Sequence, residues 1–326
     1  IRRPPRSTQS RSSAASDVYK RQLLWRIFVF DFLKKLFGDK SKPVVPINIE
    51  TAPLSEEQLR SVTRVMINYE PPQLLVGCAQ SIGKQREHNE DSLFAMTSVL
   101  SYNDTKTSFG IFMIADGMGG HQHGEVASEK AVRTVAEELI NKLFFAVLGT
   151  RENQGESLHE IMETAVLEAQ TTVAKKAPGG GTTLTAALVV GEQVTIAQVG
   201  DSRAYFIYPD GRIQVVTQDH SLVHRLVELG QITAEEAGAH PQRNVLYRAI
   251  GQTEPFKPDI NTHMLPHPGY MLLCSDGLWG VVPETEMFRL IRSASNPTDA
   301  CYQLVQAANA AGGPDNISVI LVQYMS

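Results

Sequence analysis

Two long stretches of the chain place apolar residues at the spacing of an α-helix. Over Val126–Phe145 the apolar positions fall three or four residues apart, and Leu158–Val173 repeats the pattern. Residues with this spacing share one face of a helix, so both stretches are predicted to be amphipathic helices. Shorter helices are expected at Glu284–Ile291 and Thr298–Ala310, and short helical pieces at Ser221–Gly238.

Short apolar runs bounded by turn residues separate these helices. Gly191-Glu192 and Pro209-Asp210-Gly211 are turn signals of the kind that joins the two strands of a hairpin. The consecutive runs between residues 183 and 217 are therefore expected to pair antiparallel. The helices come in pairs and not one after each strand, which favours an α+β fold with sheets inside and helices outside. The predicted strands are Ser92–Ala95, Gly110–Ala115, Thr183–Val190, Val194–Val199, Ala204–Tyr208, Ile213–Thr217, Met271–Cys274 and Ser318–Gln323.

Composition and charge narrow the class of protein. The 326 residues are 42% hydrophobic and 20% charged, which is ordinary for a globular chain and excludes bulk disorder. No run of 18 apolar residues occurs, so a membrane-spanning helix is not expected. Residues 1–42 hold 11 of the 30 basic residues and 3 of the 35 acidic ones, which leaves the rest at a net charge of −13. Such an acidic surface argues against nucleic-acid binding.

The three cysteines Cys78, Cys274 and Cys301 have no C-x-x-C spacing. This excludes a disulfide framework and a cysteine zinc site, and it suits a reducing compartment such as the cytoplasm.

The N-terminal part of the chain differs from the rest. Residues 1–22 have almost no apolar content, and Asp17–Gln22 can be encoded by a transposon end used in sequencing libraries, so we expect an adapter-derived or disordered tail. The apolar segment Leu23–Phe37 is too short to span a bilayer. We expect a helix or strand that docks on its own domain, or a piece of mistranslated upstream sequence, with contact to a membrane surface as the alternative. An extension and linker over 23–73 would then precede a main domain over 74–326.

Five places at the ends of apolar runs carry acidic residues. Buried carboxylates repel one another unless a cation binds them, and oxygen ligands of this kind suit Mg²⁺, Mn²⁺ and Ca²⁺. A single Asp-Gly would be interpreted as a turn, but five acidic points at the ends of apolar runs predict a site for hard cations. These positions are Glu90-Asp91, Asp116, Asp201, Asp276 and Asp315, of which Asp116 and Asp276 precede a glycine.

Eight short motifs follow one another along the main domain: GKQREHNEDS (83–92), ADGMGGHQHGEVAS (115–128), GTTLTAALV (181–189), GDSRAY (200–205), QDHSLV (218–223), HPQRNVLYRAIG (240–251), LLCSDGLW (272–279) and GGPDNISVI (312–320). One such motif is weakly specific, but eight in a family's order are not expected by chance. With these motifs the sequence resembles the metal-dependent protein serine/threonine phosphatases of type 2C, in their bacterial form. The resemblance implies a four-layer α-β-β-α sandwich of two antiparallel sheets flanked by helices, with a metal site at one edge.

The resemblance also implies which residues bind metal. Asp116 would bridge two Mn²⁺ or Mg²⁺ ions, and the backbone oxygen of Gly117 would bind one of them. The counterparts of Asp276 and Asp315 would hold the other ion, and Asp276 would share a weaker third ion with Asp201. Glu90 and Asp91 would complete the second site, directly or through water.

The activity implied by the resemblance is hydrolysis of phosphoserine and phosphothreonine in proteins. Two ions about 4 Å apart can share one hydroxide and stabilise an in-line displacement without a phosphoenzyme. Arg86 matches the arginine that binds the substrate phosphate, where a guanidinium fork is better suited than a lysine. Met118 stands where animal members have a histidine, a proposed general acid. His121 is the expected substitute and His123 the alternative, unless both only line the loop.

Several other residues are expected to be structural. Cys78 and Cys274 lie on apolar runs and no C-x5-R loop is present, so both are expected to be inert core thiols. His220 is expected to make structural hydrogen bonds, and Thr182-Thr183 to form a tight turn beside the site.

Two other classes of protein compete with the enzyme. A pseudophosphatase on the same fold would lack metal ligands, and none is missing from the sequence. A calcium-binding structural domain would contain a D-x-D-x-D-G loop, and the chain has none. The expected partners of the enzyme are phosphoprotein substrates and a Ser/Thr protein kinase, and we expect a monomer.

Overall fold

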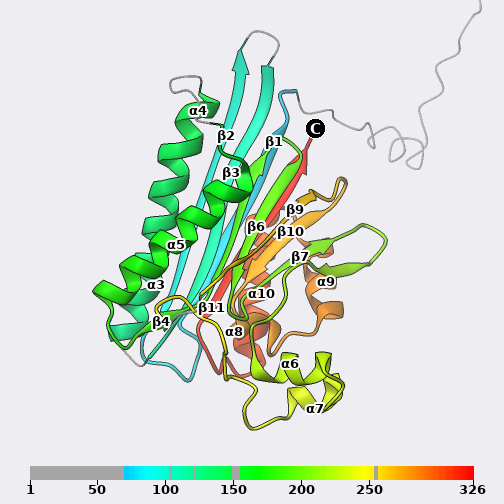
Figure 1. Cartoon of the computed structure of the whole chain (residues 1–326). Helices are drawn as coiled ribbons and strands as arrows, with labels where there is room; N and C mark the ends of the chain where they lie inside the picture. Colours follow the sequence, from blue (N-terminus) through cyan, green and yellow to red (C-terminus); the bar gives the residue numbers. More distant parts are fainter. Residues whose placement is uncertain (1–69, 103–104, 120–121, 149–154, 253–255) are drawn as a thin grey trace, which may run out of the picture. The chain divides into compact units, whose positions relative to one another are not determined.

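The computed structural model describes residues 70–102, 105–119, 122–148, 155–252 and 256–326 (Figure 1). The predicted tail, the segment Leu23–Phe37 and the linker that follows it lie outside the described residues.

The described chain forms two antiparallel sheets. The strand order of the first is β1-β11-β10-β7-β8, and that of the second is β2-β3-β5-β6-β9, with the short β4 paired to β3. The strands of the first sheet are β1 (Gln73–Ser81), β7 (Arg203–Ile207), β8 (Ile213–Val215), β10 (Tyr270–Cys274) and β11 (Ile317–Met325). Those of the second are β2 (Asp91–Tyr102), β3 (Thr105–Met118), β4 (Gly181–Thr182), β5 (Leu184–Val190), β6 (Gln193–Val199) and β9 (Asp259–Met264).

The alternation of side chains along the strands builds three apolar cores. On β3, Phe112 and Ile114 pack in one cluster with Phe206 and Leu273 of the other sheet. The residues between them on β3 point the opposite way, because successive side chains of a strand alternate between its faces. Met113 accordingly packs in a second cluster, with helices α3 and α5. A third cluster joins the first sheet to α9 and α10. The result is the predicted four-layer α-β-β-α sandwich.

The helices follow the predicted apolar stripes. α3 (Gln122–Leu139) continues through a π-helical turn (Ile140–Phe144) into α4 (Phe145–Val147), and α5 (Leu158–Lys176) lies beside it in Figure 1. α5 begins with a capping box, in which the Ser157 hydroxyl accepts from the Glu160 N–H and the Glu160 carboxylate accepts from the Ser157 N–H. The remaining helices are α6 (Leu222–Glu228), α7 (Ala234–Gly238), α8 (Asp276–Trp279), α9 (Glu284–Ser293) and α10 (Pro297–Ala310).

One pairing prediction was wrong. β5–β6 and β7–β8 are hairpins as expected, but β6 and β7 belong to different sheets. The chain crosses from one sheet to the other at Gly200-Asp201-Ser202, and Gly200 has the positive φ of +94° that a glycine adopts without strain. The tight connection therefore carries an acidic residue to the sheet edge instead of closing a hairpin.

The prediction for Cys78 was also wrong in part. Cys274 is buried as expected, whereas Cys78 is exposed on β1. β1 is an edge strand, so only one side of it is covered by a neighbouring strand. Partial burial still raises the pKa of the Cys78 thiol, which keeps it in the unreactive protonated form.

Candidate metal centre

The acidic residues of the predicted site come from both sheets. Asp91 is the first residue of β2 and pairs directly with Asp116 on β3. Asp276 opens α8 immediately after β10, and Asp315 lies just before β11. Asp201 lies in the crossover between β6 and β7. The ends of strands from two stacked sheets thus bring five aspartates to one edge of the sandwich.

Mutual repulsion among these acids shows that they lie close together. Burial raises the pKa of Asp116 well above its ordinary value, and the charges of Asp91, Asp276, Asp201 and Asp315 raise it further. Burial, followed by the charge of Asp315, raises the pKa of Asp276 to about 6. Buried acids that repel one another in this way favour the bound proton or another cation over the bare carboxylates.

Two carboxylate oxygens of the cluster have no hydrogen-bond partner. Asp91 is 7% exposed, and its Oδ2 accepts from Ser275 Oγ at 2.9 Å and Ser318 Oγ at 2.6 Å. Asp91 Oδ1 and Asp276 Oδ1 are buried without a partner. Burial raises the pKa of Asp91 to about 7, although the two serine hydroxyls act in the opposite direction. Buried, unsatisfied carboxylate oxygens are costly, and a hard divalent cation would satisfy them.

Backbone packing around Gly117 brings main-chain oxygens to the same place. A Cβ on Gly117 would lie 2.3 Å from the Gly124 oxygen and 2.6 Å from the Glu90 oxygen, so only glycine fits. The Gly117 N–H donates to the Glu90 oxygen at 3.1 Å. The Glu90 side chain lies against Gly124, where a Cβ would be 2.0 Å from Glu90 Oε2. Glu90 and Gly117 are therefore held next to the aspartates.

Two threonines hold the backbone of Asp116. The Thr182 hydroxyl donates to the Asp116 oxygen at 2.8 Å, and the Asp116 N–H donates to Thr183 Oγ1 at 2.9 Å. Thr183 Oγ1 also pairs with Ser202 Oγ at 2.8 Å, which links Asp116 to the crossover beside Asp201. The prediction of a tight turn at Thr182-Thr183 was wrong, because Thr182 ends the short strand β4 and Thr183 lies between β4 and β5. The two residues do lie beside the site, where they fix the position of an acidic residue.

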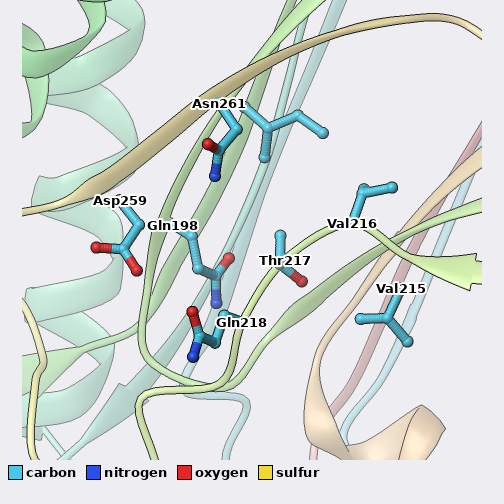
Figure 2. Close-up of a pocket in the computed structure, with 8 residues that line it drawn as sticks. Gln198, Val215, Val216, Thr217, Gln218, Asp259 and Asn261 are labelled. Atoms are coloured by element: carbon cyan, nitrogen blue, oxygen red, sulfur yellow. The ribbon is translucent and has the colours of Figure 1, made fainter.

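Taken together, the donor set fits a hard divalent cation. It consists of buried carboxylates and main-chain oxygens, it includes two orphaned oxygens, and it lacks sulfur. Among the described residues, no three or more His, Cys, Asp or Glu side chains are already arranged as the ligands of one metal ion. The fit therefore rests on the two unpaired carboxylate oxygens, the raised pKa values of the buried aspartates and the close packing around Gly117. The polar cavity of ≈ 220 Å³ in Figure 2 includes none of these acids in its lining.

Comparison with known proteins identifies the family. A family model described as protein phosphatase 2C matches residues 77–317. The chain belongs to the protein phosphatase 2C family. Among the described residues, no helix has both the length and the apolar character needed to cross a membrane.

Relatives and solved structures agree with the family. The serine/threonine phosphatase stp of Listeria monocytogenes is 39% identical over 246 residues, which are 74% of this chain and 92% of that protein. The serine/threonine phosphatase PstP/Ppp of Mycobacterium tuberculosis has a TM-score of 0.65 and 28% identity, with 78% of this chain and 99% of that chain covered. The catalytic domain of PstP in complex with two manganese ions covers the same shares, with a TM-score of 0.62 and 28% identity. The chain is a serine/threonine phosphatase of the metal-dependent 2C type, as found in bacteria.

Arg86 lies at the rim of the acidic cluster. Its Nη2 donates to Asp315 Oδ2 at 2.7 Å, and its side chain is 52% exposed. The hydrogen bond to Asp315 raises the pKa of Arg86, so its charge is retained at any working pH. An exposed guanidinium anchored on an acid of the cluster can turn its remaining N–H groups towards a phosphate.

Asp201 joins the cluster from the crossover between β6 and β7. It is 7% exposed, and burial, followed by Asp276 and Asp219, raises its pKa to about 8. The Trp279 indole N–H donates to the Asp201 backbone oxygen at 3.0 Å. Arg203 stacks over Trp279 at 3.6 Å and makes a fork of hydrogen bonds to Asp219. The crossover is therefore anchored firmly on both sides of the aspartate.

The predicted general acid is not located by this structure. His121 lies outside the described residues, and the alternative His123 is exposed in the first turn of α3. Sequence reasoning missed the hydroxyls of Ser275 and Ser318 and the amide of Asn316, which accepts from the Glu90 N–H at 2.8 Å. Asp276 and Asp315, which adjoin Ser275 and Asn316, were singled out, and Ser318 begins a predicted strand, but nothing in the sequence showed where these short polar side chains point.

Proposed function

We propose that this phosphatase hydrolyses phosphoserine and phosphothreonine in proteins by in-line attack of water, without a phosphoenzyme, and that it opposes a Ser/Thr protein kinase. The observation that carries the proposal is Asp116, which is buried among four other aspartates from two sheets. In this proposal residues 74–326 form the catalytic domain, which acts as a monomer in the cytoplasm on phosphoproteins.

Mn²⁺ or Mg²⁺ would bind on the acidic edge. Asp116 would serve both ions, and this role is supported by the charges of aspartates from its own sheet and from the other sheet, which raise its pKa. When bound, the ions lower the pKa of water and neutralise the charge of the phosphoryl group. The residues that would hold them are Glu90, Asp91, Asp116, Gly117, Asp276 and Asp315, with Asp201 and Asp276 at a third, weaker site.

The chain's own side chains support attack by water instead of by a protein nucleophile. The Cys274 thiol is fully buried, and burial raises its pKa far above neutrality. It packs in the cluster between the first sheet and α9–α10, on the face away from the other sheet. Arg86 would bind the phosphate from the rim and orient it for attack.

The test is hydrolysis of phosphothreonine peptides with Mn²⁺ and with EDTA. We expect phosphate release with Mn²⁺, loss of activity in EDTA and recovery when Mn²⁺ is restored. Activity that persists in EDTA would refute metal-assisted attack.

Exchange of Arg86 for lysine is expected to weaken phosphate binding while metal binding is retained. Lysine keeps the positive charge but cannot form the planar, bidentate fork. We expect KM for a phosphopeptide and the inhibition constant of inorganic phosphate to rise about tenfold, which corresponds to about 1.4 kcal/mol. Metal content by elemental analysis is the control. Equal phosphate affinity in the variant and the parent would contradict the role of Arg86.

Exchange of Asp201 for alanine is expected to lower turnover while two ions remain bound. Asp276 still serves the first ion, and a site with few protein carboxylates holds its ion loosely through water. The measurement is kcat together with a Mn²⁺ titration that resolves tight and weak sites. A fully active Asp201→Ala protein would remove the third ion from the mechanism.

A further inference from the structure

The loop between β1 and β2 carries both Arg86 and Glu90. Residues 82–90, all of which the structure describes, connect the end of β1 to the start of β2 without forming a helix or a strand. Such a loop has no ladder of backbone hydrogen bonds of its own, so its backbone groups need other partners. The groups that hold the loop therefore decide where its two functional side chains lie.

The side-chain amide of Asn316 holds this loop at three points. Asn316 Nδ2 donates to the Ile82 oxygen and to the His88 oxygen, each at 2.9 Å, and Oδ1 accepts from the Glu90 N–H at 2.8 Å. Asn316 is 5% exposed, and both donors of its amide are used in these contacts. One buried amide thus ties both ends of the loop to the residue that precedes β11.

The residues just before Asn316 hold the middle of the loop. The Lys84 N–H donates to the Gly313 oxygen at 2.7 Å. A Cβ on Gly83 would lie 2.2 Å from the Asp315 oxygen, and Gly83 has a φ of +83°, so only glycine allows this close approach. The backbone of Arg86 is therefore fixed on both sides of the residue.

The backbone of Asn316 also fixes the carboxylate that Arg86 contacts. The Asn316 N–H donates to Asp315 Oδ1 at 2.8 Å, and Arg86 Nη2 donates to Asp315 Oδ2 at 2.7 Å. The Arg86 side chain is 52% exposed, and a long exposed side chain without such restraints would occupy several rotamers. The direction of its remaining N–H groups is therefore set by Asp315 and by the loop backbone together.

We propose that Asn316 is a positioning residue for phosphate binding, because its amide holds loop 82–90 against residues 313–315 and so fixes the direction from which Arg86 meets the phosphate. The inference rests on the proposed function and adds the residue that holds the phosphate-binding arginine in place. Asn316 itself touches neither phosphate nor metal in this role, so its effect on phosphate affinity passes through Arg86.

The test is a double-mutant cycle between Asn316 and Arg86, measured as the inhibition constant of inorganic phosphate. Phosphate competes with a phosphothreonine peptide at saturating Mn²⁺, so a change in metal affinity does not enter. We expect Asn316→Ala to raise the constant about fivefold or more, and Arg86→Ala to raise it about tenfold or more. In the Arg86→Ala background, Asn316→Ala is expected to raise it by a further factor of about two at most, because two residues that act through one contact are not additive.

Each result of the cycle bears on the proposal. Losses that multiply in the double variant, or an unchanged inhibition constant in Asn316→Ala, would overturn it. Gly83→Ala tests the same attachment with Asn316 intact, since the added methyl group would push the loop away from the Asp315 oxygen. It is expected to weaken phosphate binding in the parent and to have no further effect in the Arg86→Ala background. A Gly83→Ala protein with the phosphate affinity of the parent would contradict the proposal.

Hydrogen exchange of the metal-free protein reports on the loop without an activity measurement. In Asn316→Ala the Glu90 N–H loses its acceptor, and the oxygens of Ile82 and His88 lose their donors. We expect the backbone amides of 82–90 to exchange faster in this variant than in the parent, with the amides of α5 unchanged. Equal exchange of the loop in both proteins would show that the amide does not hold it.

A first control removes a buried amide elsewhere. Gln170 on α5 is 7% exposed, donates to the Gln252 oxygen at 2.5 Å and accepts from the Gly251 N–H at 2.7 Å. Gln170→Ala is expected to lower the melting temperature while the inhibition constant of phosphate stays within about twofold of the parent value. A rise as large as that in Asn316→Ala would show that any loss of a buried amide weakens phosphate binding, and would refute the positioning role.

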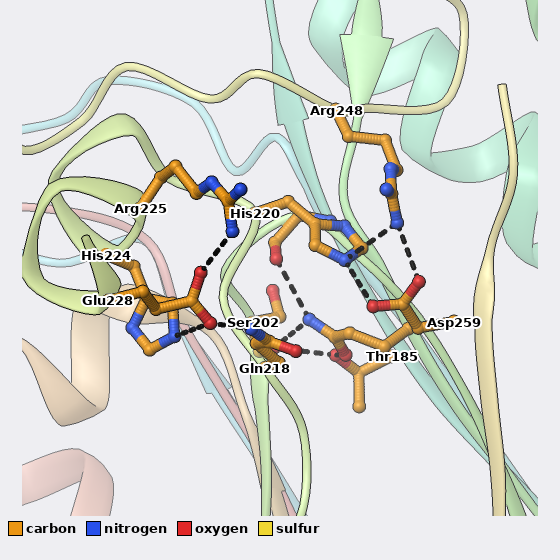
Figure 3. Close-up of polar contacts among 11 residues, drawn as sticks. Thr185, Ser202, Gln218, His220, His224, Arg225, Glu228, Arg248 and Asp259 are labelled. Carbon is orange, nitrogen blue, oxygen red and sulfur yellow. Dashed lines mark hydrogen bonds and ion pairs between the residues drawn. The ribbon is translucent and has the colours of Figure 1, made fainter. Parts of the chain in front are cut away.

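A second control removes a positive charge elsewhere. Arg225 has an exposed side chain, like Arg86, and pairs with Glu228 at 3.0 Å (Figure 3). Arg225→Gln is expected to leave the inhibition constant of phosphate unchanged, which would assign the loss in Arg86→Ala to the position of the guanidinium and not to net charge. A parent protein inactive on the phosphothreonine peptide with Mn²⁺ would refute the proposed function itself, whereas an active parent with an additive cycle would refute only the role of Asn316.

Discussion

Replacement of Asp116 by asparagine is expected to lower kcat by a factor of about a thousand or more, which is about 4 kcal/mol of transition-state stabilisation. The charges of all four other aspartates act on Asp116. The asparagine side chain would remove the negative charge that both ions would share. Activity on a phosphothreonine peptide at saturating Mn²⁺ is the measurement.

The melting temperature of the same variant serves as the control for misfolding. Burial raises the pKa of Asp116, which means that its charged form opposes the folded state when no cation is present. The asparagine variant should therefore melt at a higher temperature than the parent in EDTA at pH 8. A variant that is inactive and also less stable than the parent in EDTA would point to misfolding and not to a lost ligand.

The metal-free protein is expected to lose stability as the pH rises from about 5 to 8.5. Burial raises the pKa of Asp276 to about 6, of Asp91 to about 7 and of Asp201 to about 8. The unfolded chain releases these protons near pH 4, whereas the folded chain keeps them until pH 6–8. The folded state thus binds more protons over this interval, and the free energy of unfolding falls with pH.

The expected loss is several kcal/mol, or a fall in melting temperature of about 10 °C for a domain of this size. Mn²⁺ should abolish most of this fall, because a cation replaces the protons and binds more tightly as they leave. Melting curves at a series of pH values with EDTA and with Mn²⁺ provide the measurement. If the metal-free protein becomes more stable towards pH 8.5, the aspartates are not clustered as described.

The location of the site was predictable from the sequence because its ligands follow a local rule. Asp116 and Asp276 each follow an apolar run and precede a glycine, so the local pattern alone puts them near the end of a strand, although β3 continues to Met118. The long helices were predictable for the same reason, since the apolar spacing of α3 and α5 repeats over several turns.

Features that depend on tertiary partners were not predictable. β9 (Asp259–Met264) alternates polar and apolar residues weakly, and it exists because β6 offers it a free edge. The sequence around Gly200 is typical of a hairpin turn, and only the tertiary structure shows that β7 pairs in the other sheet. The hydroxyls of Ser275 and Ser318 donate to Asp91, which is 184 and 227 residues away along the chain, so their role does not follow from the local sequence.

The division of the aspartates between two sheets has a consequence for the spacing of the site. Asp91 and Asp116 belong to one sheet, and Asp276 and Asp315 adjoin strands of the other. An ion held by both pairs would link the two sheets at one end of the sandwich, and the separation of the pairs depends on the thickness of the apolar cluster between the sheets. Phe112 and Phe206 belong to that cluster. Side chains remote from the substrate would therefore influence the spacing of the proposed metal ligands.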